Sequence, residues 1–181
     1  MKKLLLLLLF IPLASIGQDF RKMSFGESIE NLKEKNPDIK FEIEEADGVE
    51  MAAHEDMVLG LTTAVGYVFQ DKKFVTGMYN FESEWDGDEA LKNYKSVSEQ
   101  LNAKYKMQED NKWHKSTWKD VSDRYGHALY MGDVDFVERY EGEGNTIVHS
   151  ISKDNDRLFH IVMSVNPEFE TKMREANADD F

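Results

Sequence analysis

Hydrophobic and polar residues alternate along several stretches of the chain, as they do in strands that turn one face to a core. The first such stretch is 39–44, where Ile39, Phe41 and Ile43 alternate with charged residues. Turn-forming residues at Asp47-Gly48 follow it. Later stretches predict strands over 128–140, 145–152 and 157–165.

The strongest hairpin signal is the stretch 61–81, which is rich in Val, Thr, Tyr and Phe. It is interrupted only near Asp71-Lys72, so a two-residue turn is expected there. That turn sets Phe69 against Phe74, Val65 against Met78 and Gly66 against Gly77. Paired glycines predict a shallow notch that favours close packing against the sheet.

Helical periodicity is clearest between 88 and 105, where a single apolar stripe recurs at spacings of three and four. The stripe consists of Ala90, Tyr94, Val97, Leu101 and Tyr105. Ser28 can cap a short helix that ends by Asn36-Pro37, and Asn166-Pro167 can open a last one.

These elements predict an α+β fold in which antiparallel sheets carry helices packed on one face. A helix followed by strands occurs twice, over 20–85 and 86–166, so we expect two related halves. Residues 18–166 form the predicted α+β domain, and 167–181 form a short helix with an acidic tail.

Residues 1–17 have the features of a cleavable secretory signal. Lys2 and Lys3 precede an apolar run over 4–13, and small residues at Ser15 and Gly17 predict cleavage after Gly17. The run is shorter than the roughly 20 residues that a spanning helix needs. The mature protein is therefore expected in the periplasm or the medium, without a membrane anchor.

The composition narrows the range of partners. The chain has 35 acidic and 22 basic residues, and loss of Lys2 and Lys3 with the leader changes the net charge from −13 to −15. Nucleic acid is not expected as a partner, because phosphate binding needs clustered Lys and Arg. The chain has no cysteine, so we expect neither disulfides nor a lipid-bearing cysteine, and a protein that is soluble after export.

Two histidines are the best candidates for a metal site. A turn at Asp154-Asn155 sets His149 opposite His160, with their side chains about 5 Å apart on an apolar strip. Two neutral imidazoles can share a divalent metal, but a catalytic zinc needs a third protein ligand. Candidates for it are His127, Asp133 and Asp135. The alternative is a pair of partly buried imidazoles without metal.

Positive charge gathers at 112–119, which contains two tryptophans. Trp113, Lys115 and Trp118 are candidates for binding a sugar or an anionic ligand by stacking and charge. The alternative is that one indole belongs to the core and the lysines are solvated.

The chain resembles a family of uncharacterised exported bacterial proteins that open with F-R-x-x-x-(W/F)-G-x-S. Here the opening is Phe20-Arg21 followed by Phe25-Gly26-Glu27-Ser28, and further likeness lies in 64–69, in Asp71 and Lys73, and in Leu101 with Lys104-Tyr105. The resemblance covers 19–165 and implies no activity. The helix-then-sheet units are more loosely similar to β-lactamase-inhibitor-like domains of envelope lipoproteins, from which this chain departs by lacking cysteine.

Sequence signatures of catalysis are missing: there is no P-loop, no complete nucleophile elbow and no cysteine nucleophile. The sequence favours a non-enzymatic binding or interaction module without a cofactor, whose partner is an envelope protein or a small ligand. One alternative is a metal-dependent hydrolase that uses His149 and His160. Another is a structural envelope protein acting through exposed strand edges, which would also allow a homodimer.

Overall fold

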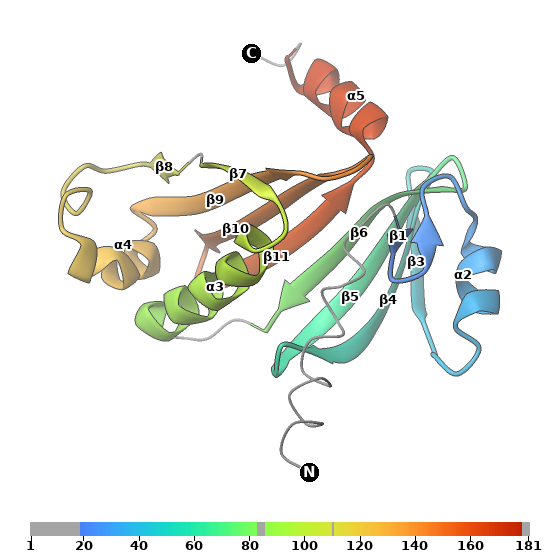
Figure 1. The fold of residues 1–181 in the computed structure, drawn as a ribbon, viewed down its shortest axis with the longest axis horizontal. Coiled ribbons are helices and arrows are strands. Elements are labelled where there is room, and N and C mark those ends of the chain that lie inside the picture. The colour runs from blue at the N-terminus through green and yellow to red at the C-terminus, as the bar shows by residue number, and fades with distance from the viewer. Residues whose placement is uncertain (1–18, 83–85, 110, 179–181) are drawn as a thin grey trace.

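The structure, a computed structural model, describes residues 19–82, 86–109 and 111–178. The predicted signal and its cleavage site, and the acidic end 179–181, lie outside this part of the chain. A nine-stranded antiparallel sheet runs in the order β3-β4-β5-β6-β11-β10-β9-β7, with β8 also paired to β9 (Figure 1). Its strands are β3 (Glu42–Ala46), β4 (Val49–Val58), β5 (Leu61–Gln70), β6 (Lys73–Phe81), β7 (Lys106–Glu109), β8 (Lys112–Trp113), β9 (Val134–Glu141), β10 (Thr146–Asp154) and β11 (Arg157–Val165).

A small hairpin, four α-helices and a 3-10 turn complete the described fold. These elements are β1 (Asp19–Phe20), β2 (Met23–Ser24), α2 (Ile29–Lys35), α3 (Gly87–Asn102), the 3-10 turn η2 (Ser122–Arg124), α4 (Tyr125–Met131) and α5 (Pro167–Ala178). The hairpin, α2, α3 and α4 contribute side chains to the clusters that cover one face of the sheet, called here the inner face. The expected α+β class with helices on one face is confirmed.

The sheet consists of two meanders that meet where β6 pairs with β11. In the first, the chain passes from the edge strand β3 through β4 and β5 to β6. In the second, it passes from β9 through β10 to β11, with β7 outside β9. Both halves therefore place their last strand at the centre. A common origin of the two halves stays a prediction.

Helices α2 and α3 begin close to where the sequence predicts. The Ser28 side chain accepts a hydrogen bond from the Asn31 backbone N–H, and the Asn31 side chain accepts one from the Ser28 backbone, which completes a capping box. The Asp86 carboxylate caps α3 by accepting from the backbone N–H groups of Asp88 and Glu89. The predicted stripe of α3 from Ala90 to Leu101 is buried.

The β5–β6 hairpin has the predicted turn but a different register beyond it. Phe69 faces Phe74, as expected. A bulge next to this pair then shifts the ladder by one residue, so that Gly66 faces Met78 and Val65 faces Tyr79. The predicted pairing of Gly66 with Gly77, and the notch with it, is therefore wrong.

Gly77 has a different role in the core. A Cβ atom at this position would overlap the ring of Phe20, which the β1–β2 hairpin places on the inner face. The ring of Phe20 also contacts the rings of Tyr67 and Tyr79, with centroids 5.4 and 5.0 Å apart. The absence of a side chain at Gly77 thus lets the N-terminal hairpin pack directly on the sheet.

Two strand predictions need correction. The segment 125–131, partly predicted as strand, forms α4, because Ala128 and Leu129 are both buried against the second half of the core. A short apolar run does not distinguish a buried helix from a strand. The strand predicted over 39–44 begins at Glu42 and is an edge strand exposed along its length, with Ile43 43% exposed.

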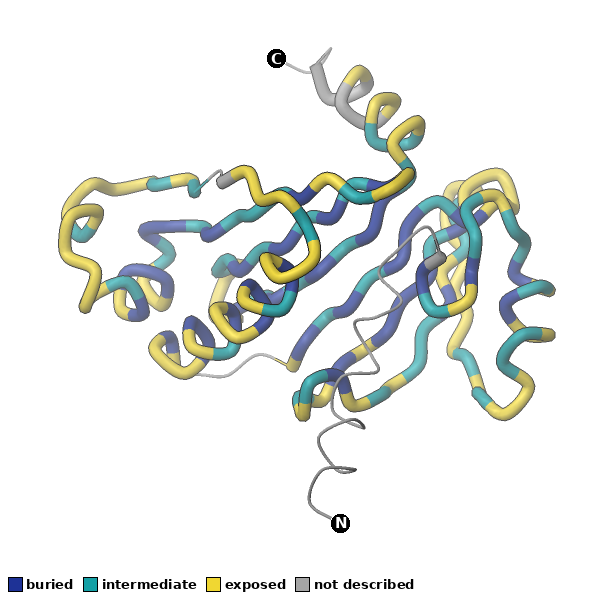
Figure 2. Tube along the Cα trace, viewed as in Figure 1, coloured by how far each residue is buried: buried dark blue, intermediate teal, exposed yellow. Residues whose placement is uncertain are grey.

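The opposite side of the sheet, called here the outer face, carries the alternate residues of each strand. Its side chains along β10 and β11 are mostly partly exposed, while their inner neighbours are mostly buried (Figure 2). Helix α5 lies beyond the end of β11 and meets the outer face at its rim, where Arg139 pairs with Glu170 (Figure 1). The outer face thus differs from the inner face in having no helix packed across it in the described residues.

Candidate functional site

The two predicted histidines meet on the inner face, between β10 and β11. His149 is fully buried and His160 is 4% exposed, and their Nε2 atoms are 2.9 Å apart. The turn lies at Asn155-Asp156, one residue later than expected, so His149 pairs with Val162 and His160 pairs with Ile151. The register predicted from Asp154-Asn155 is therefore wrong by two residues. Such a shift keeps every side chain on its face, so the imidazoles meet diagonally.

A carboxylate that the sequence analysis missed organises this pair. The Oε2 atom of Glu138 lies 2.9 Å from His149 Nδ1 and accepts hydrogen bonds from Ser98 Oγ at 2.7 Å and from the Tyr140 hydroxyl at 2.8 Å. Burial raises the pKa of Glu138, but hydrogen bonds from His149, Ser98 and Tyr140 outweigh it, so the pKa is lowered. Glu138 is therefore an ionised acceptor at neutral pH.

The hydrogen bonds assign the tautomers of both imidazoles. Ionised Glu138 can only accept, so His149 donates from Nδ1, and its Nε2 lone pair accepts from His160 Nε2–H. Burial lowers the pKa of His149 more than Glu138 raises it, and burial lowers the pKa of His160 to about 3. Both rings are neutral at neutral pH.

Aromatic rings enclose the pair. Tyr94 of α3 stacks on His149 with centroids 4.0 Å apart, and Phe81 of β6 lies 4.5 Å from the ring of His160. Ser98, one turn after Tyr94, also belongs to α3. We call Phe81, Tyr94, Ser98, Glu138, Tyr140, His149 and His160 the histidine cluster. Its hydrogen bonds and ring contacts connect α3 to β6, β9, β10 and β11.

The residues considered as a third metal ligand have other contacts. Asp133 accepts a hydrogen bond from Lys115 at 2.7 Å, and Asp135 lies 2.9 Å from His114. His127 packs against the edge of Trp118. In the described parts of the chain, no three or more His, Asp or Glu side chains form a group that could hold a metal ion. The cluster offers two ring nitrogens that are already hydrogen-bonded to each other, an arrangement that fixes packing.

The aromatic and basic segment 112–119 is divided between core and surface. Trp113 packs edge-on against Tyr125 and Phe136, and Trp118 joins the same hydrophobic cluster. Lys115 is 65% exposed and its ammonium pairs with buried Asp133. The indoles thus cover the end of the second half of the core, and the structure does not turn Trp113, Lys115 and Trp118 toward a common pocket among those described.

The outer face carries an uncharged row of side chains across the sheet, which the pattern of any single strand does not reveal. One row of side chains crosses it from β10 to β4 without a charge, through successive register partners: Val148, Met163, Met78, Gly66 and Ala53. The row ends at Arg139 on β9 and at Glu42 on β3.

The rows on either side of it are uncharged as well. One runs through Val137, Ser150, Ile161, Asn80 and Ala64, and ends at Glu55. The other runs through Thr146, Val165, Thr76, Val68 and Met51, and ends at Glu141 and Glu44. With strands about 4.8 Å apart and rows about 7 Å apart, the uncharged region measures roughly 20 by 20 Å.

The described chain contains no helix long and apolar enough to cross a membrane. Comparison with protein-family models, with curated proteins and with solved structures finds no match.

Proposed function

We propose that this chain is an exported interaction module that binds a partner protein through the outer face of its sheet. The observation that carries the proposal is the uncharged region of three rows that crosses five strands and ends at charged residues. An apolar centre with a polar rim is the usual composition of a protein interface.

The size and chemistry of the region support a protein partner. Within the uncharged region the partly or fully exposed apolar side chains include Met51, Met78, Val148, Ile161 and Met163, and exposed apolar patches on monomeric proteins are often functional. Met163 and Met78 lie side by side at its centre and are partly exposed, and methionine adapts well to an apposed surface. Glu42, Glu44 and Glu55 border one side, so the partner is expected to carry basic residues opposite β3 and β4.

Export rests on the sequence pattern of residues 1–17. The positive start, the apolar run and the small residues before Gln18 support secretion and cleavage after Gly17. The partner would then be an envelope or extracellular protein.

Site-specific photo-cross-linking in native envelopes tests the proposal. A benzophenone amino acid at Ser150, in the middle of the outer face, is expected to give a discrete protein adduct. The matched position is Ser96, which is exposed on α3. Adducts of equal yield and identity from both positions, or none from Ser150, would refute binding through the outer face.

A further inference from the structure

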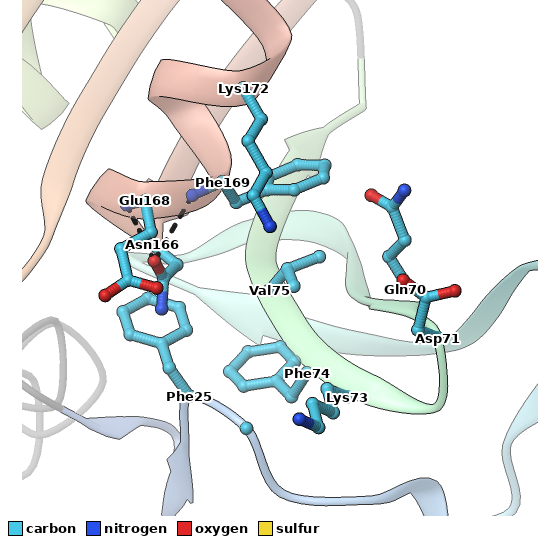
Figure 3. A pocket seen from close by; sticks show the side chains of 11 residues that line it. Phe25, Gln70, Asp71, Lys73, Phe74, Val75, Asn166, Glu168, Phe169 and Lys172 are labelled. Atoms are coloured by element: carbon cyan, nitrogen blue, oxygen red, sulfur yellow. Dashed lines mark hydrogen bonds between the residues drawn. The ribbon is translucent and has the colours of Figure 1, made fainter.

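A pocket of about 640 Å³ lies where the N-terminal segment, the β5–β6 turn and α5 come together (Figure 3). Its volume is within the range of small-molecule sites in proteins. Two backbone hydrogen bonds fix its walls: Gly26 N–H donates to the Phe74 carbonyl at 2.9 Å, and Asn166 N–H donates to the Val75 carbonyl at 3.0 Å. Three segments far apart in the sequence therefore form one cavity.

The pocket has an apolar side built from aromatic rings. Phe25 and Phe74 stack with centroids 5.5 Å apart, and Phe74 is fully buried. Phe169 and Val75 extend this surface toward α5 (Figure 3). Phe74 has no exposed surface, so a ligand meets the partly exposed Phe25, Val75 and Phe169 and must present an apolar chain or ring to them.

Two lysines border the apolar side. Lys172 extends from α5 over Val75, and Lys73 lies beside Phe74 (Figure 3). Within the described residues, no hydrogen bond or ion pair engages either ammonium group, whereas the ammonium groups of Lys35 and Lys115 are paired. Two cations beside an apolar surface can receive the anionic group of a ligand that carries an apolar chain.

The other polar groups of the pocket provide no positive charge for an anion. The Asn166 side chain accepts hydrogen bonds from the backbone N–H groups of Glu168 and Phe169, so it occupies these donors at the start of α5. Asp71 and Glu168 are also among the lining residues, and they provide the opposite charge. Anion recognition therefore depends on Lys73 and Lys172.

We propose that this pocket binds a small amphipathic carboxylate, with its apolar chain against Phe25, Val75 and Phe169 and its carboxylate at Lys172 and Lys73. The site is separate from the interaction through the outer face. Charge-assisted hydrogen bonds from lysine hold the carboxylate, and the rings remove the chain from water.

Isothermal titration calorimetry of the purified mature chain tests the site with decanoate, decanamide and decylamine. These probes share one chain length and differ in the charge of the head group. Decanoate is expected to bind at least about tenfold tighter than decanamide, the difference that loss of a charge-assisted hydrogen bond brings. The Lys172→Gln and Lys73→Gln variants should each weaken decanoate binding by about tenfold and leave decanamide unchanged.

Lys72→Gln is the matched control, because Lys72 lies in the same turn but does not line the pocket. This variant is expected to bind decanoate as the unaltered chain does. The proposal is overturned if decanoate fails to bind, if decanamide or decylamine binds as tightly, or if Lys172→Gln and Lys73→Gln behave like the control.

Discussion

The histidine cluster makes the stability of the protein depend on pH in a defined direction. His160 has a pKa of about 3 in the folded state, against 6.5 for a free histidine, because it is buried. Above pH 6.5 the ring is neutral in both states and adds no pH dependence. Below pH 6.5 the unfolded chain takes up a proton that the folded chain excludes, so the free energy of unfolding falls.

The size of the effect follows from the two pKa values. The slope is about 1.4 kcal/mol per pH unit for one histidine, and between pH 8 and pH 5 His160 alone removes about 2 kcal/mol. The pKa of His149 is lowered by burial too, so its contribution has the same sign. Glu138 does not contribute between pH 8 and pH 5. Its pKa is lowered in the folded state, so the free energy of unfolding falls on its account only below about pH 4.3, the pKa of a free glutamate.

Urea unfolding monitored by tryptophan fluorescence at pH 8, 6.5 and 5 measures this slope. His160→Gln keeps a donor for His149 and removes one titrating ring. The stability that this variant loses between pH 8 and pH 5 should therefore be about 2 kcal/mol smaller than the loss in the unaltered chain. His127→Gln, which replaces an exposed imidazole on α4, is the control. Equal pH dependence in His160→Gln and His127→Gln would show that the reasoning about the buried pair is wrong.

Three further substitutions test the packing that supports this cluster and the N-terminal segment. Glu138→Gln removes the charge that accepts from Ser98, Tyr140 and His149, and urea unfolding at pH 7 should show a loss of about 2 kcal/mol or more. Gly77→Ala places a methyl group against the Phe20 ring and should cost about 1–3 kcal/mol by the same assay; an unchanged midpoint would contradict the close approach. Ser28→Ala removes the cap of α2 and should cost about 1 kcal/mol, with Ser28→Asp retaining most of the stability.

Much of the fold could be predicted because local chemistry determines it. The turn at Asp71-Lys72 and the stripe of α3 depend on residues close in sequence, and both predictions are confirmed. The bulge beside Phe69 could not be predicted, since the turn at Asp71-Lys72 fixes the register only next to the turn and the ladder shifts by one residue beyond the Phe69–Phe74 pair. Tertiary packing likewise determines whether the short run around Ala128 is helix or strand.

The sequence was sufficient to predict that the two histidines lie on one face of the sheet, but not which residues they pair with. Alternation placed His149 and His160 on one face, and a register error of two residues cannot change that face. Glu138 was missed because a glutamate in a strand is usually solvated. A signal was available: Glu138 lies between Phe136 and Tyr140 at a spacing of two, on the face of two buried rings.

The outer face could not be recognised from single strands. Its residues are individually unremarkable, and the uncharged region exists only because five strands align Val148, Met163, Met78, Gly66 and Ala53 in register. The candidate site for a sugar or an anionic ligand was placed instead at Trp113, Lys115 and Trp118, and both indoles pack on the core.

The most direct test of binding through the outer face measures how much partner is cross-linked at Ser150 in native envelopes. The recovery is compared between the unaltered chain and a variant that carries a charge on the outer face. Ile161→Lys places an ammonium group in the uncharged region, in the row next to Met163 and Met78, and Ser96→Asp places a charge on the exposed side of α3. Both variants should keep the circular dichroism spectrum and unfolding midpoint of the unaltered chain. We predict that Ile161→Lys loses at least about nine-tenths of the partner, as a cost of about 1.4 kcal/mol implies, while Ser96→Asp retains it. Equal recovery with both variants would contradict the assignment of function to the outer face.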